Sequence, residues 1–137
     1  MINFYSENNF DLEQQSDVKI WMQKVIENED CKLGEINVIF CDDAYLHKLN
    51  VEFLEHDTLT DIITFDNSLG KQLFSEIYIS TERVLENSKE YDVAVRDELH
   101  RVLIHGVLHL CGYKDKSEKE QLVMTAKENE SLLLRKF

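Results

Sequence analysis

One long helix near the carboxyl end of the chain is predicted by the stretch Val93-Ala-Val-Arg-Asp-Glu-Leu-His-Arg-Val-Leu-Ile-His-Gly-Val-Leu-His-Leu110. Its apolar residues are too many for a single surface stripe, so we expect a central helix that is buried on most sides. Gly112 follows two residues later and allows the chain to leave the helix through a left-handed turn. We expect the rest of the fold to pack around this helix.

The same stretch carries the spacing of a metal site. His105 and His109 lie about 40° apart around a helix axis and roughly 6 Å apart along it, so both imidazoles can bind one ion. The turn at Gly112 allows Asp115 to return toward that ion. Two His and one carboxylate leave a coordination position for water, whereas closed structural zinc sites use four protein ligands that are rich in Cys. Two His at this spacing also occur by chance, but the combination with Gly112 and Asp115 favours a hydrolytic metal site.

The spacing of His, His, Gly and a last ligand also occurs in the long zinc signature of metzincin proteases. In those enzymes the residue after the first His is a Glu that acts as general base. This chain has Gly106 at that position, which has no side chain to accept a proton. The sequence therefore argues against peptide hydrolysis by that route.

The remaining periodicity predicts an α/β fold in one domain over residues 1–137, a small mixed sheet packed with helices. Strands are expected at Ile2–Tyr5, Glu35–Phe40, Asp61–Phe65 and Glu76–Ile79, the last two as an antiparallel pair. Further helices are expected after a Ser16 cap, around Leu46–Phe53, over Thr81–Tyr91 and after a capping box at Ser117–Glu120. In the last helix we expect Leu122, Val123, Ala126 and Leu133 to pack.

Composition suits a globular protein, with 43% hydrophobic and 31% charged residues among 137. The amino terminus lacks the basic and apolar segments of a signal peptide, and no stretch approaches a spanning helix, so we expect a cytoplasmic protein without membrane contact. Cys31, Cys41 and Cys111 show no paired spacing, which argues against disulfides or a Cys-rich zinc cluster. The net charge of −12 opposes long-range attraction to a polyanion. RNA binding would need a local basic groove, Mg²⁺ or a protein partner.

The segment from His105 to Tyr113 resembles the signature of the YbeY-type endoribonucleases, the ribosomal RNA maturation factors, which runs His-Gly-x-Leu-His-Leu-x-Gly-Tyr-Asp-His. A second block resembles the family pattern Leu-Asn-x-x-Tyr-Arg-x-x-Asp-x-x-Thr-Asp-x-x-Ser-Phe at Leu49-Asn50, Phe53, Asp57, Thr60-Asp61 and Phe65, and Ser75–Ser80 stands where a Gly-Asp-Ile strand is expected. The resemblance implies a zincin-like domain and a zinc-dependent endoribonuclease with one Zn²⁺ per chain. It also implies single-stranded RNA as substrate, ribosomal RNA and the small ribosomal subunit with its proteins as partners, and no action on DNA.

Three positions depart from that pattern. Asp115 stands where the family has its third His, Lys114 where it has Asp, and Leu54 where it has an Arg to which catalysis is attributed. A carboxylate binds zinc at about the distance of an imidazole, but it offsets one unit of charge, so Mn²⁺ or another divalent metal becomes more competitive. The missing Arg predicts that another cation contacts the phosphate.

Our hypothesis for that cation is Lys114, with Lys116 and Arg101 as the other nearby candidates, although each could be an ordinary surface charge. Glu98 lies seven positions before His105 on the same helical face. It could orient a ligand, deprotonate the attacking water or serve structure alone. Thr60 and Asp61 could contact substrate or only turn the chain into a strand. Two further functions stay open, a non-catalytic ribosome assembly factor, which Leu54 and the charge favour, and a metallohydrolase of another substrate class.

Overall fold

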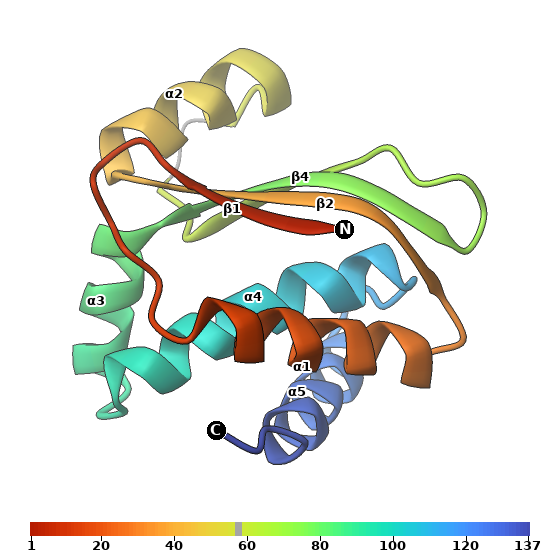
Figure 1. The fold of residues 1–137 in the computed structure, drawn as a ribbon. Helices are drawn as coiled ribbons and strands as arrows, with labels where there is room; N and C mark the ends of the chain where they lie inside the picture. Colours follow the sequence, from red (N-terminus) through yellow and green to blue (C-terminus); the bar gives the residue numbers. More distant parts are fainter. Residues whose placement is uncertain (57–58) are drawn as a thin grey trace.

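A computed structural model describes residues 1–56 and 59–137 of the chain, and Asp57 of the second family block therefore lies outside the described residues. Five helices and four strands are formed by these residues, alternating at first and ending with three consecutive helices (Figure 1). In chain order they are β1 (Ile2–Ser6), α1 (Gln15–Asn28), β2 (Lys32–Cys41), α2 (Asp43–Leu54), β3 (Ile62–Asp66), β4 (Gln72–Ser80), α3 (Thr81–Glu90), α4 (Val95–Leu110) and α5 (Glu118–Leu133). The predicted α/β class with a mixed sheet is confirmed.

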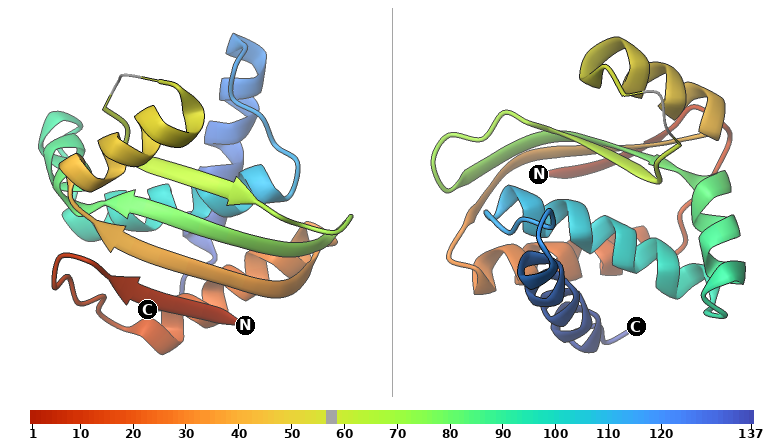
Figure 2. Two further views of the ribbon diagram at one scale, coloured as in Figure 1. Left: turned by 90° about the horizontal axis from the view of Figure 1, so that it is seen from above. Right: turned by 180° about the vertical axis from the view of Figure 1, so that it is seen from behind.

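The four strands form one sheet in the order β1-β2-β4-β3. β1, β2 and β4 run parallel, and β3 pairs antiparallel with β4, as the turn residues between them predicted. α1 and α4 pack on one face of the sheet and α2 on the other, while α5 packs against α4 on the side away from the sheet (Figures 1 and 2). α4 therefore lies between the sheet and α5.

The position of α4 follows from its apolar residues. Leu103, Ile104, Val107 and Leu108 are completely buried in the main core, together with strand residues such as Ile77. Burying such side chains is the main favourable contribution to folding, at about 25 cal/mol for each Å² of apolar surface removed from water. The central buried helix predicted from the sequence is confirmed.

The close fit of α4 to the sheet explains the glycine that follows His105. A Cβ atom at Gly106 would lie 2.8 Å from Ile62 Cδ1 and 3.4 Å from Ile77 Cδ1 and Thr64 Oγ1. Those atoms belong to β3 and β4, so this position of α4 faces the sheet, and a larger side chain here would have to displace the end of Ile62. The packing thus agrees with the sequence in disfavouring a protease-type general base at this position.

Two predicted details of the helices are wrong. α1 begins at Gln15, after a left-handed Gln14 that makes no side-chain cap, so Ser16 lies inside the helix instead of capping it. The buried face of α1 nevertheless includes the predicted Val18, Met22, Val25 and Ile26.

α5 has the predicted capping box between Ser117 and Glu120, but it turns a different face inward. Leu122 and Leu133 are exposed by 73% and 86%, and the buried residues are Met124, Glu128 and Ser131. Polar contacts decide this orientation, because Trp21 donates a hydrogen bond to the Ser131 carbonyl and Glu128 reaches side chains of α4. Within residues 1–56 and 59–137, no helix combines the length and the apolar character needed to cross a bilayer.

Candidate metal centre

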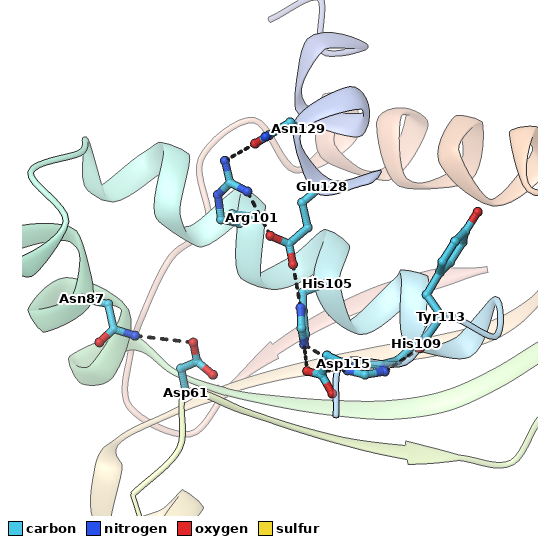
Figure 3. A network of polar contacts seen from close by, with 9 residues as sticks. All are labelled: Asp61, Asn87, Arg101, His105, His109, Tyr113, Asp115, Glu128 and Asn129. Carbon is cyan, nitrogen blue, oxygen red and sulfur yellow. Dashed lines mark hydrogen bonds and ion pairs between the residues drawn. The ribbon is translucent and has the colours of Figure 1, made fainter. Parts of the chain in front are cut away.

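The structure brings together the three predicted metal ligands at the carboxyl end of α4 (Figure 3). The Nε2 atoms of His105 and His109 lie 3.0 Å apart, as expected for two side chains one helical turn apart. Asp115 comes from the loop between α4 and α5, and its Oδ2 lies 3.2 Å from His105 Nε2 and 3.3 Å from His109 Nε2. Three potential ligand atoms thus form a nearly equilateral triangle.

The size of this triangle fits a zinc ion. With Zn–N and Zn–O distances of roughly 2.0–2.2 Å, the ligand atoms of a tetrahedral site lie about 3.3 Å from one another. The measured separations of 3.0 to 3.3 Å match that edge length. All three residues are partly exposed, so a fourth position toward solvent can be taken by water or substrate.

Backbone geometry brings Asp115 back and fixes the ring of His109. α4 ends at Leu110, and Gly112 has a φ of 107°, a conformation that favours glycine. The turn places the carbonyl of Tyr113 2.9 Å from His109 Nδ1. Since a carbonyl only accepts, Nδ1 donates and Nε2 carries the lone pair that a metal requires. The Tyr113 hydroxyl donates to Glu29 Oε2 at 2.7 Å, which ties this loop to the end of α1.

Glu128 is a residue of the candidate site that was not predicted from the sequence. Its Oε2 lies 2.6 Å from His105 Nδ1, and its Oε1 accepts from Arg101 Nη1 at 2.9 Å (Figure 3). The carboxylate is an acceptor, so His105 donates through Nδ1 and directs its Nε2 lone pair toward Asp115 and His109. Metal-binding His residues commonly donate their second ring nitrogen to a carboxylate in this way. Met124, Glu128 and Ser131 share one face of α5 at helical spacing, but that spacing alone does not distinguish this face from the apolar one that the sequence predicted to be buried.

Arg101, predicted as a candidate cation, lies one turn before His105 and is held by α5. Its Nη1 contacts Glu128 and its Nη2 donates to Asn129 Oδ1 at 2.7 Å. Its charge is therefore balanced by Glu128, which in turn holds His105. The structure places Arg101 behind the metal ligands, where it can act through Glu128.

The charges around His105 shift several pKa values. Burial alone would lower the pKa of His105, but the hydrogen bond and charge of Glu128, with Asp115 and Asp61, raise it above its ordinary value. Burial raises the pKa of Asp61, against the opposing charge of His105. Burial also raises the pKa of Glu98, and the neighbouring charge of Asp61 adds to that effect. Carboxylates thus surround a histidine in a partly desolvated space.

That space is a cavity of about 700 Å³ that extends from His105 and Asp115 along α4. Asp61 and Asn87 lie on one side of α4 and Glu128 on the other (Figure 3). The predicted residues Glu98 and Arg101 also line this cavity. Glu98 is two helical turns before His105, roughly 10 Å along the axis, and does not join the group of ligand atoms.

The other predicted cations lie elsewhere. Lys114 is exposed and borders a separate hollow with Lys119 and Glu120, and it is not among the residues that line the cavity. Lys116 is also exposed. Leu54, where the family has Arg, is at the end of α2 and is not among the described residues that line the cavity. The structure therefore does not bring Lys114 into the cavity, and its role stays a prediction.

Fold and site together define a class of protein: a small α/β domain with a candidate hydrolytic metal centre on its central helix. The sequence profile of the family described as Endoribonuclease YbeY matches residues 2–135, so the chain belongs to this family. It is 56% identical over 133 residues to the Endoribonuclease YbeY of Christiangramia forsetii, covering 97% of this chain and 93% of that one. It is 50% identical to the protein of the same name from Flavobacterium johnsoniae, covering 98% and 96%.

A solved structure has the same fold. The solution structure of TM1509 from Thermotoga maritima superposes with a TM-score of 0.68 and 26% identity, covering 96% of this chain and 87% of that one. The family membership inferred from the His105 to Tyr113 signature is thus shown, and the resemblance extends over nearly the whole chain.

Proposed function

We propose that this protein is a metal-dependent endoribonuclease that cuts single-stranded RNA and takes part in the maturation of ribosomal RNA. The observation that carries the proposal is the triangle of His105, His109 and Asp115, whose dimensions fit a zinc ion, in a chain of the Endoribonuclease YbeY family. The proposed metal is Zn²⁺, one per chain, with Mn²⁺ as the alternative that the carboxylate ligand favours.

Each side chain around the centre has a defined part. A bound divalent metal would supply a polarised phosphodiester oxygen and a more acidic water for attack on phosphorus. His105, His109 and Asp115 hold the metal, and Glu128 and the Tyr113 carbonyl keep the two imidazoles in the required tautomer. Arg101 positions Glu128. We do not place Glu98 at the reacting water, because it lies two helical turns away.

Lys114 keeps its predicted role of contacting the phosphate from solvent. It is adjacent to Asp115 and exposed, so an RNA strand can reach it without rearrangement. A Lys114→Ala variant is expected to retain its metal and to bind RNA more weakly, with a shallower dependence on salt. Unchanged metal content, cleavage rate and salt dependence would remove Lys114 from the mechanism.

Single-stranded RNA as substrate is proposed from the family resemblance, and the charge of the chain bears on which partners it needs. Because the chain has 27 acidic and 15 basic residues, long-range attraction to RNA is unfavourable, and we propose that proteins of the small ribosomal subunit supply selectivity in the cytoplasm. The same charge, with Leu54, favours a second candidate function, a non-catalytic ribosome assembly factor.

One experiment separates these functions. Protein purified without chelator or metal-affinity resin is analysed by elemental mass spectrometry and then incubated with matched single-stranded and duplex RNA. Near-stoichiometric zinc and cleavage of the single strand, both lost in Asp115→Ala but retained in the exposed-site control Asp11→Ala, would support the nuclease. Metal without RNA cleavage, but with turnover of small phosphoesters or peptides, would indicate another metallohydrolase. Absence of both metal and RNA cleavage would favour the function of a non-catalytic ribosome assembly factor.

A further inference from the structure

The cavity beside the metal ligands contains groups that the proposed cleavage reaction does not use. Its volume of about 700 Å³ lies within the range of about 300–1,000 Å³ that is typical of small-molecule sites. Around Glu98, in the first turn of α4, the cavity is lined by Asn87 and Tyr91 around the end of α3, and Asp61 and Ile62 at the start of β3 connect this end to the neighbourhood of His105. The cavity as a whole is large enough for a group that extends beyond the three candidate ligands.

Glu98 is the most informative of these groups. The residue is only 6% exposed, yet its carboxylate makes no hydrogen bond or ion pair with any described residue and lines the cavity. Carboxylates of buried residues usually have hydrogen-bond partners, and the Glu98 oxygens, which have none among the described residues, are not among the fully buried unpaired atoms there and so open into the cavity. Glu98 therefore presents two acceptor oxygens to whatever enters this end of the cavity.

The charge balance of the cavity disfavours a phosphate at this end. Five carboxylates and two guanidinium groups line it, and they belong to Asp61, Asp97, Glu98, Asp115, Glu128, Arg101 and Arg135. Both guanidinium groups are already paired, Arg101 with Glu128 at 2.9 Å and Arg135 with Asp97 at 3.0 Å. An anion would meet unbalanced negative charge here, whereas an uncharged group rich in N–H donors would match it.

We propose that this end of the cavity is a subsite for an unpaired guanine base of the RNA, bound through its N1–H and N2–H donors by the two oxygens of Glu98. Two parallel donors match a carboxylate in the same way as an arginine fork does. Uracil offers one N–H between two carbonyl oxygens, which Glu98 would repel. Single-stranded RNA can turn a base out of its stack and present this edge. The inference rests on the proposed function, because it takes RNA to be the ligand.

The surrounding residues suit the faces and the remaining edge of such a base. Tyr91 lines the cavity with 61% of its surface exposed, so its ring is available for stacking. Ile62 and Val102 contribute apolar side chains to the wall of the cavity. The Asn87 amide donates to Asp61 at 3.4 Å, a long hydrogen bond, and provides a donor suitable for the guanine O6 (Figure 3).

The test uses the whole protein and two independent readouts. A pool of unstructured RNA with randomised positions is cleaved, and the cut ends are sequenced. We expect guanine to exceed uracil about tenfold at one position near the cut, because one well-formed pair of hydrogen bonds discriminates bases by about that factor. The second readout is the binding of guanosine and uridine 5′-monophosphates to metal-free protein. This binding is monitored through the NMR chemical shifts of backbone amides around Glu98.

Glu98→Gln, which keeps the shape of the side chain, is expected to remove the guanine preference in both readouts. Glu90→Gln is the matched control, since Glu90 is exposed and lies outside the cavity lining. Should Glu98→Gln fail to fold, Tyr91→Ala at the exposed rim is expected to weaken nucleotide binding about tenfold without changing the ranking of the bases.

The outcomes separate this inference from the proposed function. Selective binding of the guanine nucleotide without any RNA cleavage would support the guanine subsite and contradict the proposed nuclease function. Cleavage with equal use of all four bases and no difference between the two nucleotides would overturn the subsite and leave the nuclease intact. A guanine preference that persists in Glu98→Gln would also overturn the subsite.

Discussion

Two of the three histidines of α4, His100 and His105, face opposite environments. His100 and His105 are five residues apart, so their side chains point about 140° apart around the helix. His100 is 2% exposed and packs between the rings of Trp21 and Phe137, with centroids 5.4 and 5.5 Å away. His105 is half-buried and faces the carboxylates of the cavity. Burial, with the charges of Arg135 and Arg96, lowers the pKa of His100 to about 4, whereas the pKa of His105 is raised.

The difference shows that neighbouring groups, and not the residue type or the helix, decide what each histidine does. Arg135 Nη1 lies 2.8 Å from His100 Nδ1, and since guanidinium only donates, that nitrogen must accept. Glu128 lies against the same atom of His105 and only accepts, so there Nδ1 must donate. His100 is thereby kept neutral as part of the core, and His105 is oriented to give its Nε2 lone pair to a metal.

The largest expected effect is the difference in metal binding between variants of His105 and His100. His105→Ala removes a ligand, so metal binding and RNA cleavage should be lost, by more than the roughly 10–100-fold that loss of an outer partner costs. His100→Ala should retain stoichiometric metal, because His100 contacts Trp21 and Phe137 and no ligand, but it should lower the free energy of unfolding by about 2–4 kcal/mol. Elemental mass spectrometry and urea denaturation measure the two effects. Loss of metal in both variants would contradict the assignment.

The second largest expected effect is a loss of stability at acidic pH that is caused by His100. Its ordinary pKa is about 6.5, so between pH 6.5 and 4 the unfolded chain binds a proton that the folded chain excludes, and stability falls as the pH decreases. With a folded pKa of about 4, the full loss is about 3 kcal/mol below pH 4 and is absent above pH 6.5. Urea denaturation of wild type and of the non-titrating His100→Gln isolates this loss. Parallel stability profiles for the two proteins would show that His100 is not the cause.

This contrast also marks what the sequence could predict. The apolar periodicity of Val93 to Leu110 and the spacing of His105, His109, Gly112 and Asp115 depend on local helix geometry, so the helix and the grouping of these three polar side chains at its end could be predicted from the sequence. The antiparallel pair β3 and β4 followed from the turn between them. Each of these features is determined within a short segment.

Features that depend on contacts between distant segments were missed. Glu128 meets His105 across 23 residues of chain, and no local pattern states which face of α5 turns toward α4. The apolar residues of α5 predicted the wrong face, because the hydrogen bond of Trp21 and the ion pair of Arg101 with Glu128 orient the helix instead. Lys114 adjoins Asp115 in sequence, but its side chain borders a different hollow.

A smaller effect on metal affinity is expected from a change at Glu128, the residue that orients His105. Glu128→Gln keeps the size of the side chain but removes the charge that favours the Nδ1–H form of His105, so zinc affinity should fall about 10–100-fold. The matched control is Glu130→Gln, at an exposed position on the same helix, and it should bind zinc as wild type does. Competition with a chelator indicator measures both affinities. Equal affinity of Glu128→Gln and wild type would show that the hydrogen bond does not tune the metal ligand.

The smallest expected effect is a pH dependence of metal-free protein with the opposite sign to that of His100. The folded pKa of His105 is raised above the unfolded value of about 6.5, so the stabilisation from its protonated form is complete below pH 6.5 and is lost as the pH rises through the folded pKa. The stability difference between wild type and His105→Gln should therefore decrease from pH 6 to pH 8 in the presence of chelator. With excess zinc the trend should reverse, because the metal needs a deprotonated Nε2 and binds more tightly as the proton leaves. A difference that does not change with pH in chelator would mean that Glu128 and Asp115 do not hold a proton on His105, and the contrast between the two histidines would then rest on burial alone.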